Sequence, residues 1–244
     1  MYLKSRDDTC ADSLKSPLNH PAFIRIFPFA LFMLFIGLEE SARFLDRKGI
    51  LLLGDHALYW IYPVKAAMVG AVLIYFRRGY PEIRFSDLRR PAFTAASLLT
   101  GLGVFWLWIK MDWSFGTQGT PAGFDPTVFE GPARAGMTAV RLAGAVLVVP
   151  VMEELFWRSF LIRYIIGSNF SKIPVGAFSW ASFLITVVLF GLEHNYFLAG
   201  MMAGAAFNLL LYYTRSISQC ILAHAVANLA LGTYVLQTGQ WRFW

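Results

Sequence analysis

Long runs of apolar residues alternate along this chain with short polar segments. Several of these runs are about 17–20 residues long, the length that a helix needs to cross a hydrocarbon core of about 30 Å. The pattern predicts an all-α fold, a polytopic bundle of transmembrane helices with seven spans, or eight if a weaker run near residues 50–62 also crosses. The helices are expected at about residues 23–38, 57–76, 91–109, 136–166, 175–194, 197–213 and 217–236.

The polar segments predict how the chain is organised. Residues 1–20 are expected to form a polar N-terminal leader, and residues 21–244 a single integral membrane domain. The loop at 77–90 carries five arginines. Because arginine and lysine are enriched in cytoplasmic loops, this loop is expected on the cytoplasmic side.

Composition narrows the class of protein further. Hydrophobic residues make up 57% of the chain and charged residues only 15%, which is too apolar for an ordinary soluble domain. The net charge of +6 comes largely from basic residues in loops. It therefore points to a lipid bilayer as partner and to no nucleic acid.

Three polar clusters interrupt the late apolar runs and carry the candidate chemistry. A charged side chain at the centre of a transmembrane helix costs roughly 2.5–3.5 kcal/mol, so such residues are candidates for function. In the first cluster, Glu154 and Arg158 stand four residues apart on one helix face, in the order that favours an ion pair. Glu153 points to another face without a cation nearby in the sequence, which suits a general base. The alternative is a structural ion pair at a helix end, with Glu153 wetted by water.

The other two clusters supply imidazole and amide groups. Phe190 and His194 share a helix face, and His194 can accept or donate a proton, whereas Glu193 is expected on a different face, toward solvent. His224 and Asn228 lie one turn apart on the last helix, where two fixed donors can form an oxyanion site. The alternatives are a helix-end histidine capped by water and hydrogen bonds that hold helices together.

A metal site is the alternative to a site without a cofactor. Zinc binds sets of histidine and carboxylate ligands, and Glu153, His194 and His224 form the set that would hold it. The motif H-E-x-x-H is absent, and no single predicted helix supplies two histidines and a glutamate. Because Asn228 beside His224 fits a pair of donors better than a zinc site, we expect a mechanism without metal or other cofactor.

The motifs E-E-x-x-x-R, F-x-x-x-H and H-x-x-x-N follow in this order, each on its own late hydrophobic helix. In this arrangement the chain resembles the CAAX-protease and bacteriocin-processing family of intramembrane endopeptidases. The resemblance covers about residues 137–236, the catalytic core of that family. It implies that Glu153 activates water with help from His194, and that His224 and Asn228 stabilise the tetrahedral oxyanion.

The same resemblance gives roles to the neighbouring residues. Glu154 and Arg158 are implied to be a supporting pair. A glycine often follows the motif arginine, and Ser159 stands there in this chain, which is expected to alter helix packing and not the chemistry. The implied activity is hydrolysis of a peptide bond in a membrane-associated protein or peptide. Because the family also contains immunity proteins without demonstrated proteolysis, a non-catalytic membrane scaffold stays open.

A finer resemblance concerns the bacterial branch of the family that is linked to exosortase protein-sorting systems. The segments VMEELFWRSFLIRY, FGLEH and TGQWRFW carry it. It implies a protein of the bacterial inner (cytoplasmic) membrane, with exosortase-system partners and a substrate that need not be prenylated. A proton-coupled transporter is the other alternative, but it predicts internal repeats or broken helices, and neither is evident in the sequence.

Overall fold

The computed structural model describes residues 20–54, 56–113 and 123–244, and within these ranges it consists of helices without β-strands. The predicted all-α, polytopic fold is confirmed. The predicted polar leader lies almost entirely outside the described residues. The helices are α1 (Pro21–Arg47), α2 (Ile61–Tyr75), α3 (Pro91–Trp108), α4 (Gly131–Ala143), α5 (Val149–Glu154), α6 (Ile162–Ile166), α7 (Trp180–Leu192), α8 (Phe197–Thr214) and α9 (Ile217–Thr238), the π-helical segments η6 (Gly144–Val148) and η7 (Leu155–Leu161), and the 3₁₀ turns η2 (Ala57–Trp60), η3 (Arg77–Gly79), η4 (Phe85–Arg89), η5 (Pro126–Val128), η8 (Phe170–Lys172) and η9 (Trp241–Phe243).

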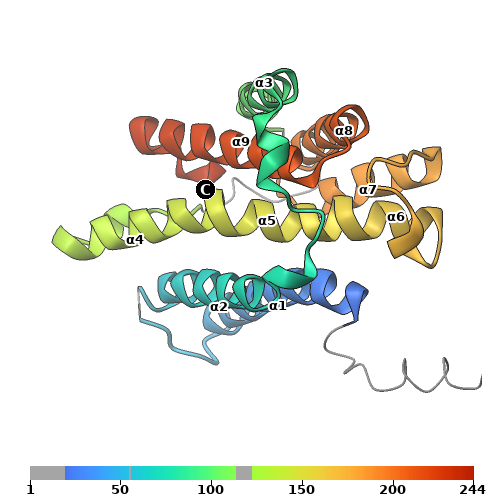
Figure 1. Ribbon diagram of the computed structural model, residues 1–244. Helices are drawn as coiled ribbons and strands as arrows, with labels where there is room; N and C mark the ends of the chain where they lie inside the picture. Colours follow the sequence, from blue (N-terminus) through green and yellow to red (C-terminus); the bar gives the residue numbers. More distant parts are fainter. Residues whose placement is uncertain (1–19, 55, 114–122) are drawn as a thin grey trace, which may run out of the picture.

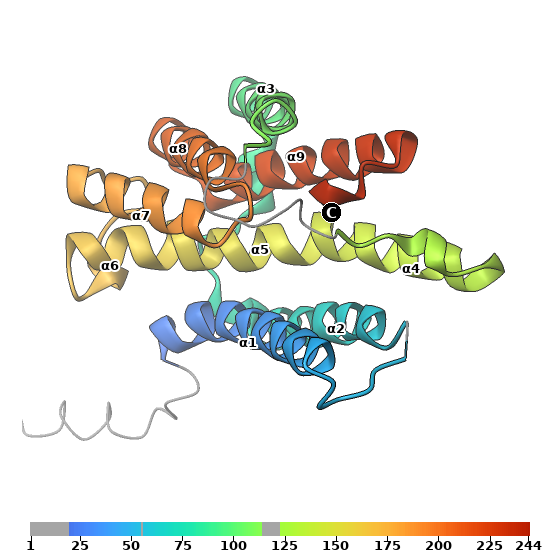
Figure 2. The same ribbon diagram turned by 180° about the vertical axis from the view of Figure 1, so that it is seen from behind.

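The helices pack in layers around one long central rod (Figure 1 and Figure 2). The rod is the continuous helical segment Gly131–Ile166, which contains α4, η6, α5, η7 and α6. Helices α1 and α2 lie on one side of the rod, and α3, α8 and α9 lie on the other, with α7 beside α8. The middle of the rod is therefore covered from both sides.

Two hydrophobic cores lie against the two sides of the rod. Toward α1 and α2, Met152 and Leu155 are fully buried and belong to one cluster with Val69. Toward α8 and α9, Trp157 belongs to a second cluster with Phe207. A short stretch of the rod thus contacts both outer layers, which holds the polar residues within that stretch in defined directions.

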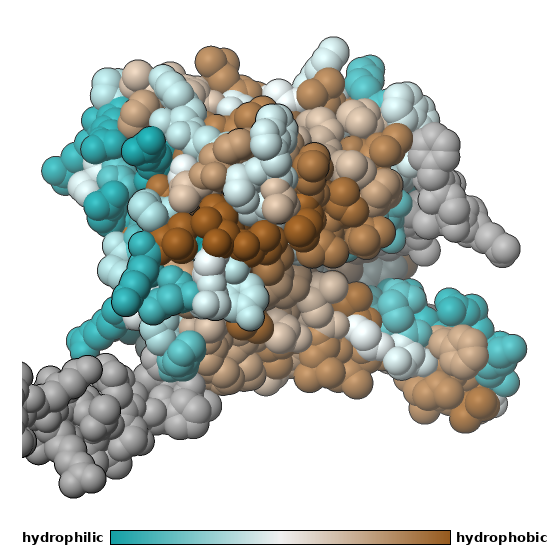
Figure 3. All heavy atoms as spheres, turned by 90° about the vertical axis from the view of Figure 1, so that its right-hand side faces the viewer, coloured by the Kyte–Doolittle hydropathy of each residue, from teal (hydrophilic) through white to brown (hydrophobic). Residues whose placement is uncertain are grey.

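The surface is that of a protein embedded in lipid. Six helical segments are long and apolar enough to cross a membrane, whereas α7 is a shorter apolar helix of 13 residues. Leu99 and Leu209 are 70% and 60% exposed. Figure 3 shows hydrophobic side chains over much of the face turned to the viewer, with hydrophilic ones in separate groups. Exposed apolar surface of this extent marks an interaction surface, here with the bilayer. The described residues near 50–62 form turns and η2, which leads into α2, and not an eighth span.

A buried polar network closes one end of the bundle. Arg25 at the start of α1 donates to both carboxylate oxygens of Glu82 in the 77–90 loop, at 2.8 and 2.7 Å. Ser159 of the rod donates to the same carboxylate and accepts hydrogen bonds from Arg25 and Arg163 at 3.1 and 2.8 Å. The serine that follows the motif arginine therefore links the rod to α1 and to the loop that is predicted to be cytoplasmic.

Candidate active site

The length of α7 decides which late residues can meet. This helix has only 13 residues, so it rises about 20 Å from Trp180 to Leu192. Glu153 lies a similar distance, about 20 Å, along the rod from its end at Ile166, and α6 contacts α7 at that end. His194, just beyond α7, therefore lies at the same depth as Glu153, in the middle of the bundle.

The polar residues meet at a cavity of about 300 Å³ between the layers. Most of its wall is apolar and comes from α1, α3, the rod, α8 and α9. Two cationic residues, Lys65 and Arg141, also line it. The cavity brings together all four residues predicted to be catalytic: Glu153, His194, His224 and Asn228.

Glu154 and Arg158 form the ion pair that their spacing predicts, with 3.1 Å between Arg158 Nη1 and Glu154 Oε1. Both residues are fully buried. Arg158 also donates to Asn208 Oδ1 at 3.2 Å and to the carbonyl oxygen of Gly204 at 3.3 Å. Its guanidinium carbon lies 4.6 Å from the ring centroid of Phe190. Because these contacts occupy the guanidinium, the pair is a fixed element behind the cavity wall.

His224 connects this ion pair to the cavity. Its Nδ1 lies 2.9 Å from Glu154 Oε1, and its Nε2 lies 4.0 Å from Glu153 Oε2. The ring stacks on Phe207, with 5.0 Å between centroids. Because a carboxylate only accepts, Nδ1 carries the hydrogen of the bond to Glu154. The adjacent glutamates thus differ: Glu154 holds His224, whereas Glu153 faces the cavity.

His194 is oriented by the preceding helical turn. Its Nδ1 lies 2.7 Å from the carbonyl oxygen of Phe190. Since a carbonyl oxygen only accepts, Nδ1 is the donor, and Nε2 of the neutral ring is left as an acceptor. Trp108 packs edge-on against the imidazole, with 5.2 Å between centroids. The neutral ring can therefore accept a hydrogen bond from a water molecule.

Asn228 reaches the cavity at a break in the hydrogen bonding of the rod. In η6 the N–H of Val149 bonds the carbonyl oxygen of Gly144, five residues earlier. The next carbonyl, that of Ala145, would need the N–H of Pro150, which has none. Asn228 Nδ2 donates to this carbonyl oxygen instead, at 2.7 Å. The second hydrogen on the same nitrogen remains available to a substrate.

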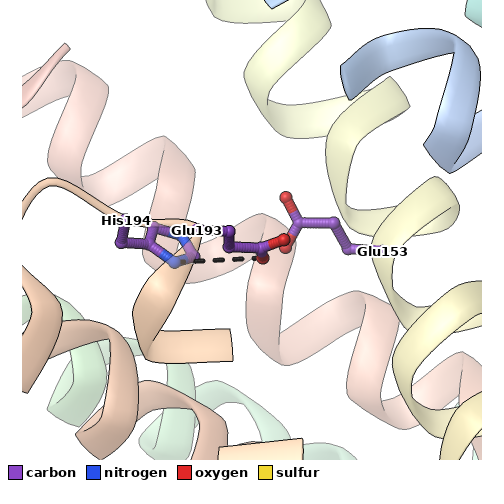
Figure 4. A group of neighbouring side chains, drawn as sticks. All are labelled: Glu153, Glu193 and His194. Carbon is purple, nitrogen blue, oxygen red and sulfur yellow. Dashed lines mark ion pairs between the residues drawn. The ribbon is translucent and has the colours of Figure 1, made fainter. Parts of the chain in front are cut away.

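Glu193 does not face solvent, so that expectation is wrong. Helix α7 ends at Leu192, and residue 193 starts the turn into α8, so its position on an extended helix no longer applies. The side chain is only 10% exposed, lines the cavity and accepts a hydrogen bond from Trp157 Nε1 at 3.2 Å. Figure 4 shows its carboxylate pointing toward that of Glu153, with His194 alongside. The only signal in the sequence is an acid placed directly before the motif histidine.

Glu153, Glu193 and His194 are also the residues that could hold a metal ion. Each offers one ligand atom, and the three atoms lie within 4.8 Å of one another. Imidazole nitrogen and carboxylate oxygen are ligands that zinc accepts. The alternative set with His224 is not brought together in this way within the described residues, although Nε2 of His224 lies 4.0 Å from Glu153 Oε2.

The fold and the cavity define a class of protein: an integral membrane protein whose helices enclose carboxylate, imidazole and amide groups at mid-depth. Residues 135–230 match the family model described as Rce1-like, Type II CAAX prenyl endopeptidase Rce1-like. The match covers less than half of the chain but includes all three polar motifs. It confirms the predicted resemblance to the CAAX-protease family and does not bear on the exosortase-linked branch. No curated protein and no solved structure gives a significant match.

Proposed function

We propose that the protein is an intramembrane endopeptidase that hydrolyses a peptide bond without a metal or other cofactor. The observation that carries the proposal is the placement of Glu153. It is 7% exposed, its Oε2 has no hydrogen-bond partner in the described part of the chain, and it faces the cavity beside His194. The Rce1-like match supports the same class of reaction.

In the proposed mechanism, Glu153 removes a proton from a water molecule that also donates a hydrogen bond to Nε2 of His194. The water oxygen attacks the scissile carbonyl carbon, with the carboxylate as general base. When the tetrahedral intermediate collapses, Glu153 gives this proton to the amide nitrogen, the C–N bond breaks and the carbonyl reforms. The negative charge that develops on the carbonyl oxygen is stabilised by the free N–H of Asn228. When both ring nitrogens of His224 carry hydrogen, its Nε2–H adds a second donor. The ion pair behind the cavity wall keeps this imidazole in place.

The substrate is expected to be a membrane-associated protein or peptide. The cavity wall is mainly apolar, so it suits apolar side chains on both sides of the scissile bond. The family description refers to a CAAX prenyl endopeptidase; for this chain we propose a substrate that need not be prenylated. The finer expectation is a bacterial inner-membrane enzyme whose partners belong to an exosortase system.

A cleavage assay on the purified full-length protein tests the proposal. The probe is a pool of internally quenched peptides with apolar residues around the central bond, added to protein in lipid vesicles. We expect Glu153→Gln and His194→Ala to lower kcat by roughly 10²–10⁴-fold, as for loss of a general base. The control is Glu40→Gln, which changes a 66% exposed glutamate side chain on α1. Cleavage by both site variants at the wild-type rate would show that proteolysis does not occur at this site. No cleavage by the wild type would favour a non-catalytic scaffold or a proton-coupled transporter.

Metal dependence needs its own measurement. We expect the wild type to keep its activity after stringent chelation and to contain no stoichiometric zinc by elemental analysis. Loss of activity on chelation with recovery on adding zinc would replace the proposed mechanism with a metal-dependent one.

A further inference from the structure

The cavity continues along the rod beyond the residues that the proposed mechanism uses. One face of the rod lines it at four positions, Arg141, Ala145, Val149 and Glu153. Because these positions span three helical turns, Arg141 lies about 18 Å along the rod from Glu153. Asn228 binds the carbonyl oxygen of Ala145 and therefore lies between them. The proposed general base thus lies toward one end of the cavity and Arg141 toward the other.

Two cationic side chains meet at that second end. Lys65 of α2 and Arg141 of the rod both lie against the ring of Tyr62, with Nζ 5.3 Å and the guanidinium carbon 4.3 Å from its centroid. Near the end of a membrane helix, such side chains usually extend outward to water. Lys65 is instead only 5% exposed, and both residues line the cavity. Their charges therefore belong to the inside of the bundle.

The charge of Lys65 is only partly balanced by the protein. Its Nζ lies 3.8 Å from Glu39 Oε2, which is longer than a hydrogen bond. The other oxygen of Glu39 accepts a hydrogen bond from Arg43 at 2.7 Å. One carboxylate is thus shared between two cations, and the nearer of them is not the one in the cavity.

Arg141 is packed by aromatic rings. Its guanidinium carbon lies 5.6 and 5.8 Å from the ring centroids of Phe124 and Trp244, in addition to Tyr62. Its Nε is buried and has no hydrogen-bond partner among the described residues. Aromatic rings interact with a cation but accept none of its conventional hydrogen bonds. An anion that enters the cavity would supply the missing acceptor and offset the cost of the buried charge.

We propose that Lys65 and Arg141 form a subsite that binds a carboxylate of the substrate. The inference rests on the proposed endopeptidase function and adds a specificity to it. Both side chains only donate hydrogen bonds, and a carboxylate accepts strong, charge-assisted ones from them. The two cations line the same cavity as the proposed catalytic groups, so a bound peptide, and not a lipid headgroup on the outer surface, is the expected source of the anion.

The spacing along the rod predicts where this carboxylate lies in the peptide. Arg141 is one helical turn, about 6 Å, from the carbonyl group that binds Asn228, and about 18 Å from Glu153. An extended peptide advances about 3.3–3.6 Å per residue. The carboxylate is therefore expected about two to five residues from the scissile bond. Either an acidic side chain or the carboxyl terminus of the substrate can meet this requirement.

Matched peptides test the carboxylate without any change to the protein. Each is an apolar, internally quenched peptide with an amidated C-terminus and one glutamate about two to five residues from the central bond, on either side. Its twin has glutamine at that position, and a further peptide has no glutamate but a free C-terminal carboxylate. The full-length protein is used in phosphatidylcholine vesicles, which carry no anionic lipid.

We expect one peptide with a carboxylate to have a kcat/KM roughly 10–100-fold higher than its uncharged twin, as for hydrogen bonds to a charged group. A preference for a glutamate peptide would assign the subsite to an acidic side chain. A preference for the free C-terminus would assign it to the substrate's carboxyl terminus. Equal kcat/KM for every pair would overturn the proposal.

Variants then test which residues carry the preference. We expect Lys65→Gln and Arg141→Gln each to lower the ratio of kcat/KM between the charged and uncharged twins by about 10-fold. Arg78→Gln, at an exposed arginine of the 77–90 loop, is the control and should keep the wild-type ratio. Because both twins are measured on the same variant, partial loss of folded protein cancels in this ratio. A wild-type ratio in both Lys65→Gln and Arg141→Gln would overturn the assignment.

Binding to the Glu153→Gln protein separates this inference from the proposed function. Fluorescence anisotropy of labelled twins should show a Kd roughly 10–100-fold lower for the charged peptide, and Arg141→Gln in the same background should remove the difference. This result would support the subsite even if the wild type cleaved no peptide, an outcome that would contradict the endopeptidase function alone. Equal binding of all twins would overturn the subsite. Equal binding together with an unfolding midpoint that phosphatidylglycerol raises in the wild type and not in Arg141→Gln would assign the cations to a lipid headgroup instead.

Discussion

At the residue scale, the adjacent acids Glu153 and Glu154 differ in the side chains that contact them. Glu154 accepts from both Arg158 and His224, and it is fully buried. Such an ion pair need not add net stability, but removing one partner leaves a buried charge uncompensated. In this site the pair also fixes the imidazole that faces Glu153, so structure and reactivity depend on the same contacts.

The first prediction at this scale concerns that pair. Arg158→Met should lower the free energy of unfolding by about 3–5 kcal/mol, because the carboxylate of Glu154 loses its charged partner. The midpoint of unfolding in detergent measures this change. Arg78→Met, at an exposed arginine of the 77–90 loop, is the control and should leave the midpoint nearly unchanged. Equal midpoints for the two variants would contradict a compensated buried pair.

Spacing in the sequence predicts some of these residue contacts and not others. The four-residue interval from Glu154 to Arg158 predicts their pairing, because it is set by the helix itself. The bond between His224 and Glu154 joins residues 70 positions apart and depends on how α9 packs on the rod. Glu193 could not be placed, because its direction is set by where α7 stops.

At the element scale, close packing of α3 on α9 places the backbone of His224. A Cβ at Gly101 would overlap the carbonyl oxygen of Ala223 and lie 2.9 Å from Cβ of Val226. Gly103, in the same helix, has open space around it. Residue 101 must therefore be a glycine because α9 packs closely against it, and not because of its backbone conformation.

The prediction at this scale uses the two glycines as a matched pair. Gly101→Ala should destabilise the protein by about 1–3 kcal/mol, because the added methyl group forces α3 and α9 apart. It should also lower kcat, because His224 follows Ala223 in α9 and would be shifted away from its position in the site. Gly103→Ala should be neutral or slightly stabilising, by up to about 1 kcal/mol, because alanine restricts the unfolded chain. Unfolding midpoints and cleavage rates of the two variants are compared. Similar behaviour of the pair would show that α3 does not pack tightly at Gly101.

The helices themselves were largely predictable from hydrophobic runs, and the depth of the site was not. The run expected at 175–194 suggests a full span, but the helix covers only Trp180–Leu192. Its start follows Ser179, whose side chain caps the N–H of Ser182, and its end lies at the turn before Tyr196. Such local capping and turn geometry shorten a helix without changing its hydropathy, so the meeting of residues 153 and 194 is evident only in three dimensions.

At the scale of the whole molecule, the layers are joined at one end by Glu82. This carboxylate binds the guanidinium of Arg25 in α1 and the hydroxyl of Ser159 in the rod. Burial alone raises the pKa of Glu82, but the hydrogen bonds and charge of Arg25 and the hydrogen bond of Ser159 outweigh it, so the pKa lies below its usual value of 4.5. The loop that contains Glu82 thus connects α1 to the rod, two elements that lie far apart in the sequence.

The lowered pKa predicts how stability depends on pH. Because the folded protein binds the proton of Glu82 more weakly than the unfolded chain, this residue contributes its full stability above about pH 4.5, near the unfolded pKa. The contribution is lost as the pH falls through the folded pKa. Glu82→Gln should be less stable than the wild type at pH 7, by about 2–3 kcal/mol for the loss of a charge-assisted partner, and the difference should shrink on acidification.

The measurement is the midpoint of thermal unfolding in detergent between pH 7 and pH 3 for the wild type, Glu82→Gln and Glu40→Gln. Among the described residues, the exposed Glu40 has one ion-pair contact, with Arg43 at 3.9 Å, so its variant should follow the wild type throughout. A difference between Glu82→Gln and the wild type that stays constant with pH would mean that the layers are held by packing and not by the Arg25–Glu82 pair. A difference that closes only below pH 4.5 would assign the acid sensitivity of the bundle to this one carboxylate.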